Sequence, residues 1–84
     1  SFNNIYPNPF NDHTMIDILS NNYGLIRLNI YDIQGRLVKT ILHDNTKKNT
    51  NKIRLSLTGI SSGNYIINIL SKNNSVSRIV TFLK

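Results

Sequence analysis

The sequence predicts an all-β protein, folded as a single antiparallel β-sandwich of about seven strands. Three observations lead to this fold class. Apolar and polar residues alternate with a period of two, as at Ile53, Leu55 and Leu57, which is the pattern of a strand with one buried face. Ile is abundant while the strong helix formers Ala and Glu are absent, and this favours strands. Turn residues separate the apolar runs at the spacing of a sandwich or barrel.

The alternation sets the expected strands and the expected core. Strands are expected at 2–6, 13–19, 25–31, 36–42, 52–57, 64–70 and 76–83. The core should include Ile16, Ile18, Leu28, Ile30, Ile53, Leu55, Tyr65 and Ile67. No segment has the periodicity of a helix.

The first strand should end near Tyr6, because Pro7 and Pro9 lack a backbone N–H and hold the chain extended. Asn8 stands between the two prolines, and Phe10 then supplies a large apolar anchor. A proline-broken edge strand followed by a hydrophobic plug accounts for this segment in structural terms.

The turns between strands carry their own signals. Asp32 at the first position and Gly35 at the last predict a type I turn closed by a left-handed glycine. The segment 72–75 predicts a two-residue hairpin turn, with Asn73 and Asn74 at its centre. The polar stretch 43–51 is expected to be the longest and most mobile loop.

Tyr65 follows the corner that contains Gly63, just inside the sixth expected strand. A tyrosine at this place is typical of the tyrosine corner of immunoglobulin-like sandwiches. The expected sandwich is therefore immunoglobulin-like.

Length and composition limit the protein further. Its 84 residues allow one domain, 1–84, and 39% hydrophobic residues suffice for a core. No apolar run approaches the roughly 20 residues that span a bilayer, so no direct membrane insertion is expected. Without an initiator Met or a signal peptide, the sequence is interpreted as a piece of a longer chain.

The formal net charge of +6 has two interpretations. A basic face could bind nucleic acid, an anionic surface or an acidic polymer. Alternatively, Lys and Asn have accumulated on the surface through the codon bias of an AT-rich genome. The second interpretation is favoured, and no nucleic-acid partner is expected, because Tyr23 and Tyr31 are the only aromatic candidates for stacking bases.

No catalytic, metal-binding or cofactor site is expected. The absence of Cys excludes thiolate chemistry. His13 and His43 have no second ligand at the spacing of a metal site. No glycine-rich loop precedes a helix, so no phosphate cradle is expected.

The last expected strand is apolar on both faces from Ile79 to Leu83. A strand in a small sandwich normally has one face in water. This strand is therefore either covered by something else or offers an apolar edge to a partner.

Three motifs, in this order and spacing, resemble the type A C-terminal sorting domain of the bacterial type IX secretion system. The resemblance covers residues 5–84 and includes a Pro-Asn-Pro-Phe run, a Tyr-Asp-x-x-Gly-Arg-x-Val run and a Gly-x-Tyr run. Its motif residues are Pro7, Asn8, Pro9, Phe10, Asp32, Gly35, Arg36, Val38, Gly63 and Tyr65. The sequence departs from the family in the final hairpin, which has Asn in place of Gly, and in the missing Lys pair of the last strand.

The resemblance implies a non-catalytic secretion signal of Bacteroidetes-type bacteria. An outer-membrane shuttle protein and the translocon would recognise the folded domain in the periplasm and bring its cargo to the cell surface or the medium. A sortase-like peptidase would then remove the domain, which is the substrate in that reaction. The residues expected to be recognised are Ile79, Val80, Phe82, Leu83 and Lys84, rather than the lysines between Lys47 and Lys52.

Two other functions remain open. A structural immunoglobulin-like spacer in a surface protein would have the same fold without a sorting role. A carbohydrate or adhesion module would need an exposed aromatic platform, and the sequence has no Trp.

Overall fold

The computed structural model describes residues 2–6, 8–11, 13–20, 24–45, 49–71 and 74–83. Within these ranges the chain forms seven strands and no helix. The strands are β1 (Phe2–Tyr6), β2 (His13–Ser20), β3 (Gly24–Asp32), β4 (Leu37–Asn45), β5 (Asn49–Ser56), β6 (Gly63–Ser71) and β7 (Asn74–Phe82). The predicted all-β fold is confirmed, and each expected strand has a counterpart. The described residues contain no helix of the length and apolarity needed to cross a membrane.

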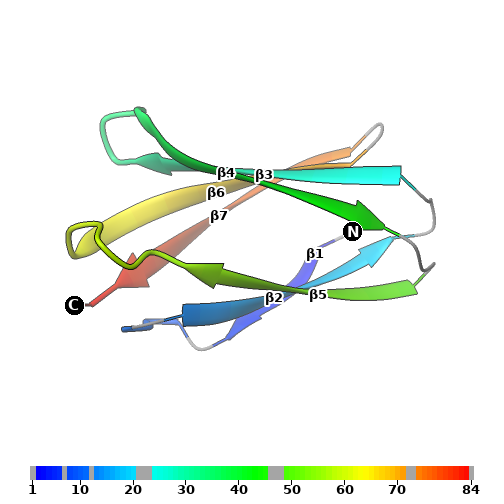
Figure 1. Cartoon of the computed structure of the whole chain (residues 1–84), viewed down its shortest axis with the longest axis horizontal. Helices are drawn as coiled ribbons and strands as arrows, with labels where there is room; N and C mark the ends of the chain where they lie inside the picture. The colour runs from blue at the N-terminus through cyan, green and yellow to red at the C-terminus, as the bar shows by residue number, and fades with distance from the viewer. Residues whose placement is uncertain are drawn as a thin grey trace.

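The strands form two antiparallel sheets that face each other (Figure 1). One sheet has the order β1-β2-β5 and the other has the order β4-β3-β6-β7. Every pairing between named strands is antiparallel. This three-on-four arrangement is the expected sandwich, with β4 and β7 as the edges of the larger sheet.

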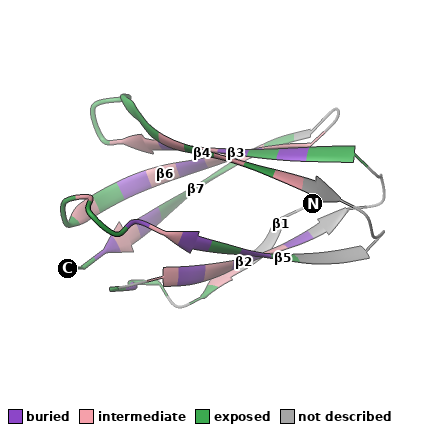
Figure 2. Ribbon diagram, in the orientation of Figure 1, coloured by how far each residue is buried: buried purple, intermediate pink, exposed green. Residues whose placement is uncertain are grey.

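The core lies between the sheets and follows the alternation of the sequence. Buried and more exposed residues alternate along β3 and β6 (Figure 2). All eight residues predicted for the core are buried, with exposed fractions of 5% or less. The buried apolar cluster also contains Phe10, Ile26, Leu57, Ile69, Val80 and Phe82.

The structure corrects two of the predicted connections. The loop expected at 43–51 is wrong at both ends, because β4 continues to Asn45 opposite Gly24 and β5 begins at Asn49 opposite Ser20; residues 46–48 lie outside the described residues. Backbone pairing thus extends both ladders into polar sequence. The two-residue hairpin expected at 72–75 is present but shifted by one residue, since Asn74 pairs with Ser71; Lys72 and Asn73 lie outside the described residues.

Strand β7 buries only one of its two apolar faces. Val80 and Phe82 are in the core, whereas Ile79 is 66% exposed and Leu83, which directly follows the strand, is 51% exposed. The strand therefore has the usual arrangement of one inner and one outer face. Its outer face nevertheless leaves two large apolar side chains in solvent.

Candidate functional site

The three sequence motifs meet at one end of the sandwich. The β3–β4 turn, the β5–β6 connection and the C-terminal end of β7 lie together at the left of Figure 1. We call this region the motif end and define it by residues 8–10, 32–36, 61–65 and 79–83. Segments that are far apart in the sequence therefore form one continuous surface.

Residues 8–10 leave the first sheet and add to the edge of β7 in the second. The Asn8 Oδ1 accepts a hydrogen bond of 2.9 Å from the Thr81 amide. The Phe10 amide donates to the Thr81 carbonyl at 3.0 Å, and the Leu83 amide donates to the Phe10 carbonyl at 2.7 Å. These bonds make a short parallel bridge between Phe10 and Phe82. The first motif thus supplies hydrogen-bond partners for the end of the last strand.

Phe10 is the predicted apolar anchor. Its side chain is 3% exposed, and its ring centroid lies 5.3 Å from that of Phe82. Tilted rings at this separation are a favourable aromatic pair. The plug therefore joins the β1–β2 connection to β7; Pro7 lies outside the described residues.

Asp32 organises the β3–β4 turn through its side chain. One carboxylate oxygen accepts the amides of Gln34 and Arg36, at 2.9 and 3.0 Å. The other oxygen pairs with the Arg36 Nε at 2.9 Å. The backbone amide of Arg36 is the largest cause that lowers the pKa of Asp32, and the Arg36 side chain lowers it further. Gly35 has the predicted positive φ, at 84°, so the turn chemistry expected from the sequence is confirmed.

Tyr65 closes the β5–β6 connection. Its hydroxyl donates to the backbone carbonyl of Ser61, four residues earlier. Its ring is buried, with 5% exposed. Gly63, with φ of 154°, provides the backbone turn into β6. This is the geometry of a tyrosine corner, as the sequence predicted.

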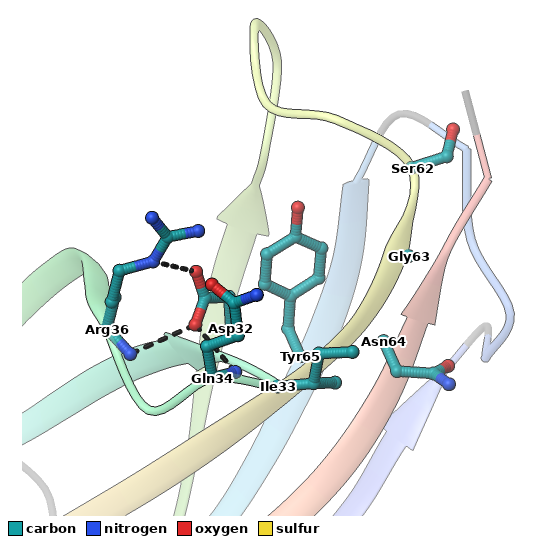
Figure 3. Close-up of a pocket in the computed structure, with 8 residues that line it drawn as sticks. All are labelled: Asp32, Ile33, Gln34, Arg36, Ser62, Gly63, Asn64 and Tyr65. Atoms are coloured by element: carbon teal, nitrogen blue, oxygen red, sulfur yellow. Dashed lines mark hydrogen bonds and ion pairs between the residues drawn. The ribbon is translucent and has the colours of Figure 1, made fainter.

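A groove lies between the Asp32 turn and the Tyr65 corner (Figure 3). Asp32 and Tyr65 are register partners on neighbouring strands, which holds the two motifs side by side. We call this groove the motif groove. It is lined by Asp32, Ile33, Gln34, Arg36, Ser62, Gly63, Asn64 and Tyr65. The Asn64 Oδ1 accepts a hydrogen bond of 2.8 Å from the Thr81 hydroxyl, and this contact connects the groove to β7 and residues 8–10.

The lining of the motif groove mixes polar and apolar residues, and the hydrogen bonds of Asp32 and Tyr65 are structural. Ile33 and the Arg36 side chain are exposed at its rim, with 76% and 73% accessible. Among the described residues, no group of three or more His, Cys, Asp or Glu side chains could hold a metal ion. The arrangement forms a shaped surface between two turns.

The residues expected to be recognised have different environments. Ile79 and Leu83 face solvent, so their side chains can touch a partner. Val80 and Phe82 are buried at 0% and 2%, so they act in the folded domain by holding β7 in the core. Lys84 lies outside the described residues. In the alternative lysine region, Lys47 and Lys48 also lie outside them, while Lys52 pairs with Asp17 at 3.1 Å.

Sequence reasoning missed the polar residues that join the motifs. Thr81, Asn64 and Ser61 were not singled out, although Thr81 bonds to both Asn8 and Asn64 and so joins the first motif to the third, while the Ser61 carbonyl accepts the Tyr65 hydroxyl within the third motif. Asn64 stands inside the Gly-x-Tyr motif, which is a signal that could have identified it. Thr81 has no comparable signal, because its partner Asn8 is distant in the sequence.

Comparison with known proteins gives one clear result. A family model described as the secretion system C-terminal sorting domain matches residues 4–81, which includes all three motifs and all seven strands in whole or in part. No curated protein matches the chain.

Proposed function

The chain belongs to the family of secretion system C-terminal sorting domains, and from this membership we propose how it acts. The family is that of type IX secretion, so the chain is a C-terminal sorting signal for export to the cell surface or the medium. We propose that residues 1–84 form one non-catalytic sorting domain. The observation that carries this proposal is the meeting of the three family motifs on one surface.

In this proposal the folded domain is recognised in the periplasm by the outer-membrane shuttle protein and the translocon. A transporter that handles many cargoes needs a common feature, and a compact sandwich offers a fixed shape. A sortase-like peptidase then removes the domain, whose role in that step is that of substrate. The motif residues act by building the recognised shape rather than by chemistry.

The recognition surface is proposed to include the outer face of β7 at the motif end. Ile79 and Leu83 are two large apolar side chains exposed there, and exposed apolar patches are typical of interaction sites. The exposed Ile33 and Arg36 extend this surface across the motif groove. Val80 and Phe82 contribute indirectly, because they hold β7 in place.

Export of a reporter tests the proposal. Residues 1–84, fused behind a Sec signal and a reporter enzyme, should carry the enzyme to the surface or medium of a host with a type IX system. The double variant Ile79→Asp with Leu83→Asp should leave the reporter in the periplasm. The matched control, Leu25→Asp with Leu42→Asp, changes exposed leucines away from the motif end and should be exported.

The measured quantities are reporter activity in periplasm, washed surface and medium, together with the unfolding midpoint of each variant. An intact fusion that stays periplasmic, while a known sorting domain exports the same reporter, would refute the proposal and favour the structural spacer. Equal loss of export in both double variants, with both folded, would show that the recognised surface is not confined to the motif end.

A further inference from the structure

The outer edge of β7 is already paired over part of its length, by the short bridge that residues 8–10 form with it. Both backbone groups of Thr81 point away from β6, because its amide bonds to Asn8 and its carbonyl to Phe10. In an antiparallel ladder the backbone groups of every second residue point to the same side. The amides and carbonyls of Ser75 and Ser77 therefore also point away from β6.

Within the described chain, the backbone of residues 75–78 has no partner strand on the side away from β6. Residues 8–10 reach from Ile79 to Leu83, and none of the described strands pairs with Ser75 to Arg78 on that side. An edge with unpaired backbone groups is a template for another strand. We call residues 75–79 the edge window.

The other edge of the same sheet is guarded. Lys39 of β4 points inward, and its Nζ donates to the Ser56 carbonyl of the opposite sheet at 2.7 Å. An inward-pointing charge on an edge strand opposes pairing with other chains. The edge window also carries a charge on its inner face, at Arg78 opposite Ile67, but this side chain is exposed, so an incoming strand that supplies a carboxylate can pair with it.

The side chains around the edge window define what it would accept. On the outer face Ser75 and Ser77 are held by the Asn68 amide at 3.2 and 3.1 Å, and the exposed Ile79 follows. On the opposite face the exposed Arg78 donates through NH1 to the Ser77 carbonyl. A partner strand must replace this contact, and a carboxylate on that strand can then receive the guanidinium.

We propose that the edge window binds an extended segment of the secretion machinery that alternates apolar and acidic residues. The apolar residues lie beside Ile79 on the outer face, and the acidic residues lie beside Arg78 on the other. Main-chain hydrogen bonds to Ser75 and Ser77 give affinity, and the alternate side chains give specificity, as in other cases of strand addition. The identity of the partner rests on the sorting function proposed above, whereas the strand addition itself rests on the geometry of β7.

A peptide titration tests the strand addition. The 84-residue chain, labelled for NMR, is titrated with a short synthetic peptide of alternating valine and glutamate. The amides of Ser75 and Ser77 should shift, and their protection from hydrogen exchange should rise at least about tenfold. A peptide of alternating valine and lysine should bind at least about tenfold more weakly.

Matched variants separate the backbone contact from the side chain. Ser77→Pro removes the outward amide at an edge position where proline is tolerated, and it should abolish binding while the chain stays folded. Ser77→Ala keeps the amide and should bind like the unchanged protein. Arg78→Glu should reverse the preference between the two peptides.

The outcomes distinguish this proposal from the sorting function. Absence of shifts at Ser75 and Ser77 up to about millimolar peptide, or shifts confined to β4, would overturn the edge window. If the Ser77→Pro fusion is folded and exported like the Ser77→Ala fusion, the edge window has no role in secretion, while the sorting function stands. If the unchanged fusion is not exported, the sorting function fails independently of peptide binding.

Discussion

Asp32 and Tyr65 stand opposite each other on β3 and β6, and each closes a connection of its own. Asp32 holds the β3–β4 turn through the Gln34 and Arg36 amides. Tyr65 holds the β5–β6 connection through the Ser61 carbonyl. Because the two residues are register partners, the ladder between β3 and β6 fixes both turns relative to each other, and the walls of the motif groove follow from this pairing.

Replacing Gly35 tests the backbone requirement of the β3–β4 turn. Its φ is 84°, and a Cβ at this position would meet no atom within 4 Å beyond its chain neighbours, so the cost of a side chain comes from the backbone alone. Gly35→Val should lower the free energy of unfolding by at least about 1–2 kcal/mol. Gly35→Asn should cost less, because Asn tolerates positive φ. Urea denaturation measures both, and equal stability of all three proteins would contradict the turn.

The Asp32 carboxylate should make the free energy of unfolding depend on pH in the acidic range. Its folded-state pKa lies below the ordinary value of 3.8, so its stabilising contribution is present above that value and is lost as the pH falls through the folded-state pKa. Asp32→Asn keeps an acceptor oxygen but cannot ionise. The stability advantage of the unchanged protein over Asp32→Asn should therefore shrink on acidification. If the stability difference between the two proteins stays constant from neutral pH to below about pH 3, the ionised Asp32 carboxylate does not stabilise the turn.

Local sequence predicted the two turns but could not predict how they are joined. Asp32 and Gly35, like Gly63 and Tyr65, lie within a few residues of their partners, so propensity and spacing suffice. The pairing of Asn8 with Thr81 spans nearly the whole chain, and no local pattern contains it. The same limit explains the misplaced 43–51 loop, where polar side chains concealed strands that are held by backbone pairing.

The terminal strand shows the difference between pattern and environment. Alternation alone assigns Val80 and Phe82 to one face and Ile79 and Leu83 to the other, yet both sets are apolar. Which set is buried depends on the opposite sheet and on Phe10, which packs against Phe82. This information is tertiary, so the sequence could identify β7 as unusual without showing which side chains face a partner.

Tyr65→Phe should test the tyrosine corner by removing one hydrogen bond. The ring is buried and stays in place, while the Ser61 carbonyl loses the hydroxyl. The expected loss in free energy of unfolding is about 1 kcal/mol. Tyr31→Phe, at a half-buried position of β3, is the control and should change stability by less. Thermal and urea unfolding give the values, and equal effects of the two substitutions would argue against the corner.

Truncating Phe10 should have the largest effect of the single substitutions considered. Phe10→Ala removes a nearly buried ring from the aromatic pair with Phe82, and such a change costs about 3–5 kcal/mol. Leu83→Ala, at a half-exposed neighbour, should change stability by only about 0.5 kcal/mol. Hydrogen exchange at the Thr81 and Leu83 amides should accelerate in Phe10→Ala. Unchanged exchange there would mean that residues 8–10 do not secure β7.

Lys39 should protect the β4 edge against self-association. Its ammonium reaches the opposite sheet and donates to the Ser56 carbonyl. On the same strand, Leu37, Val38 and Leu42 are exposed apolar side chains. Lys39→Val would make this edge a nearly continuous apolar strand without an inward charge, and such edges pair with other chains. The variant should keep its β-sheet circular dichroism but form dimers and larger species as its concentration rises in sedimentation velocity. Lys39→Arg keeps the charge and should remain monomeric under the same conditions. If Lys39→Val sediments like Lys39→Arg at every concentration, the inward lysine does not guard this edge, and the protection must come from the twist of β4 or from the shape of the neighbouring turn.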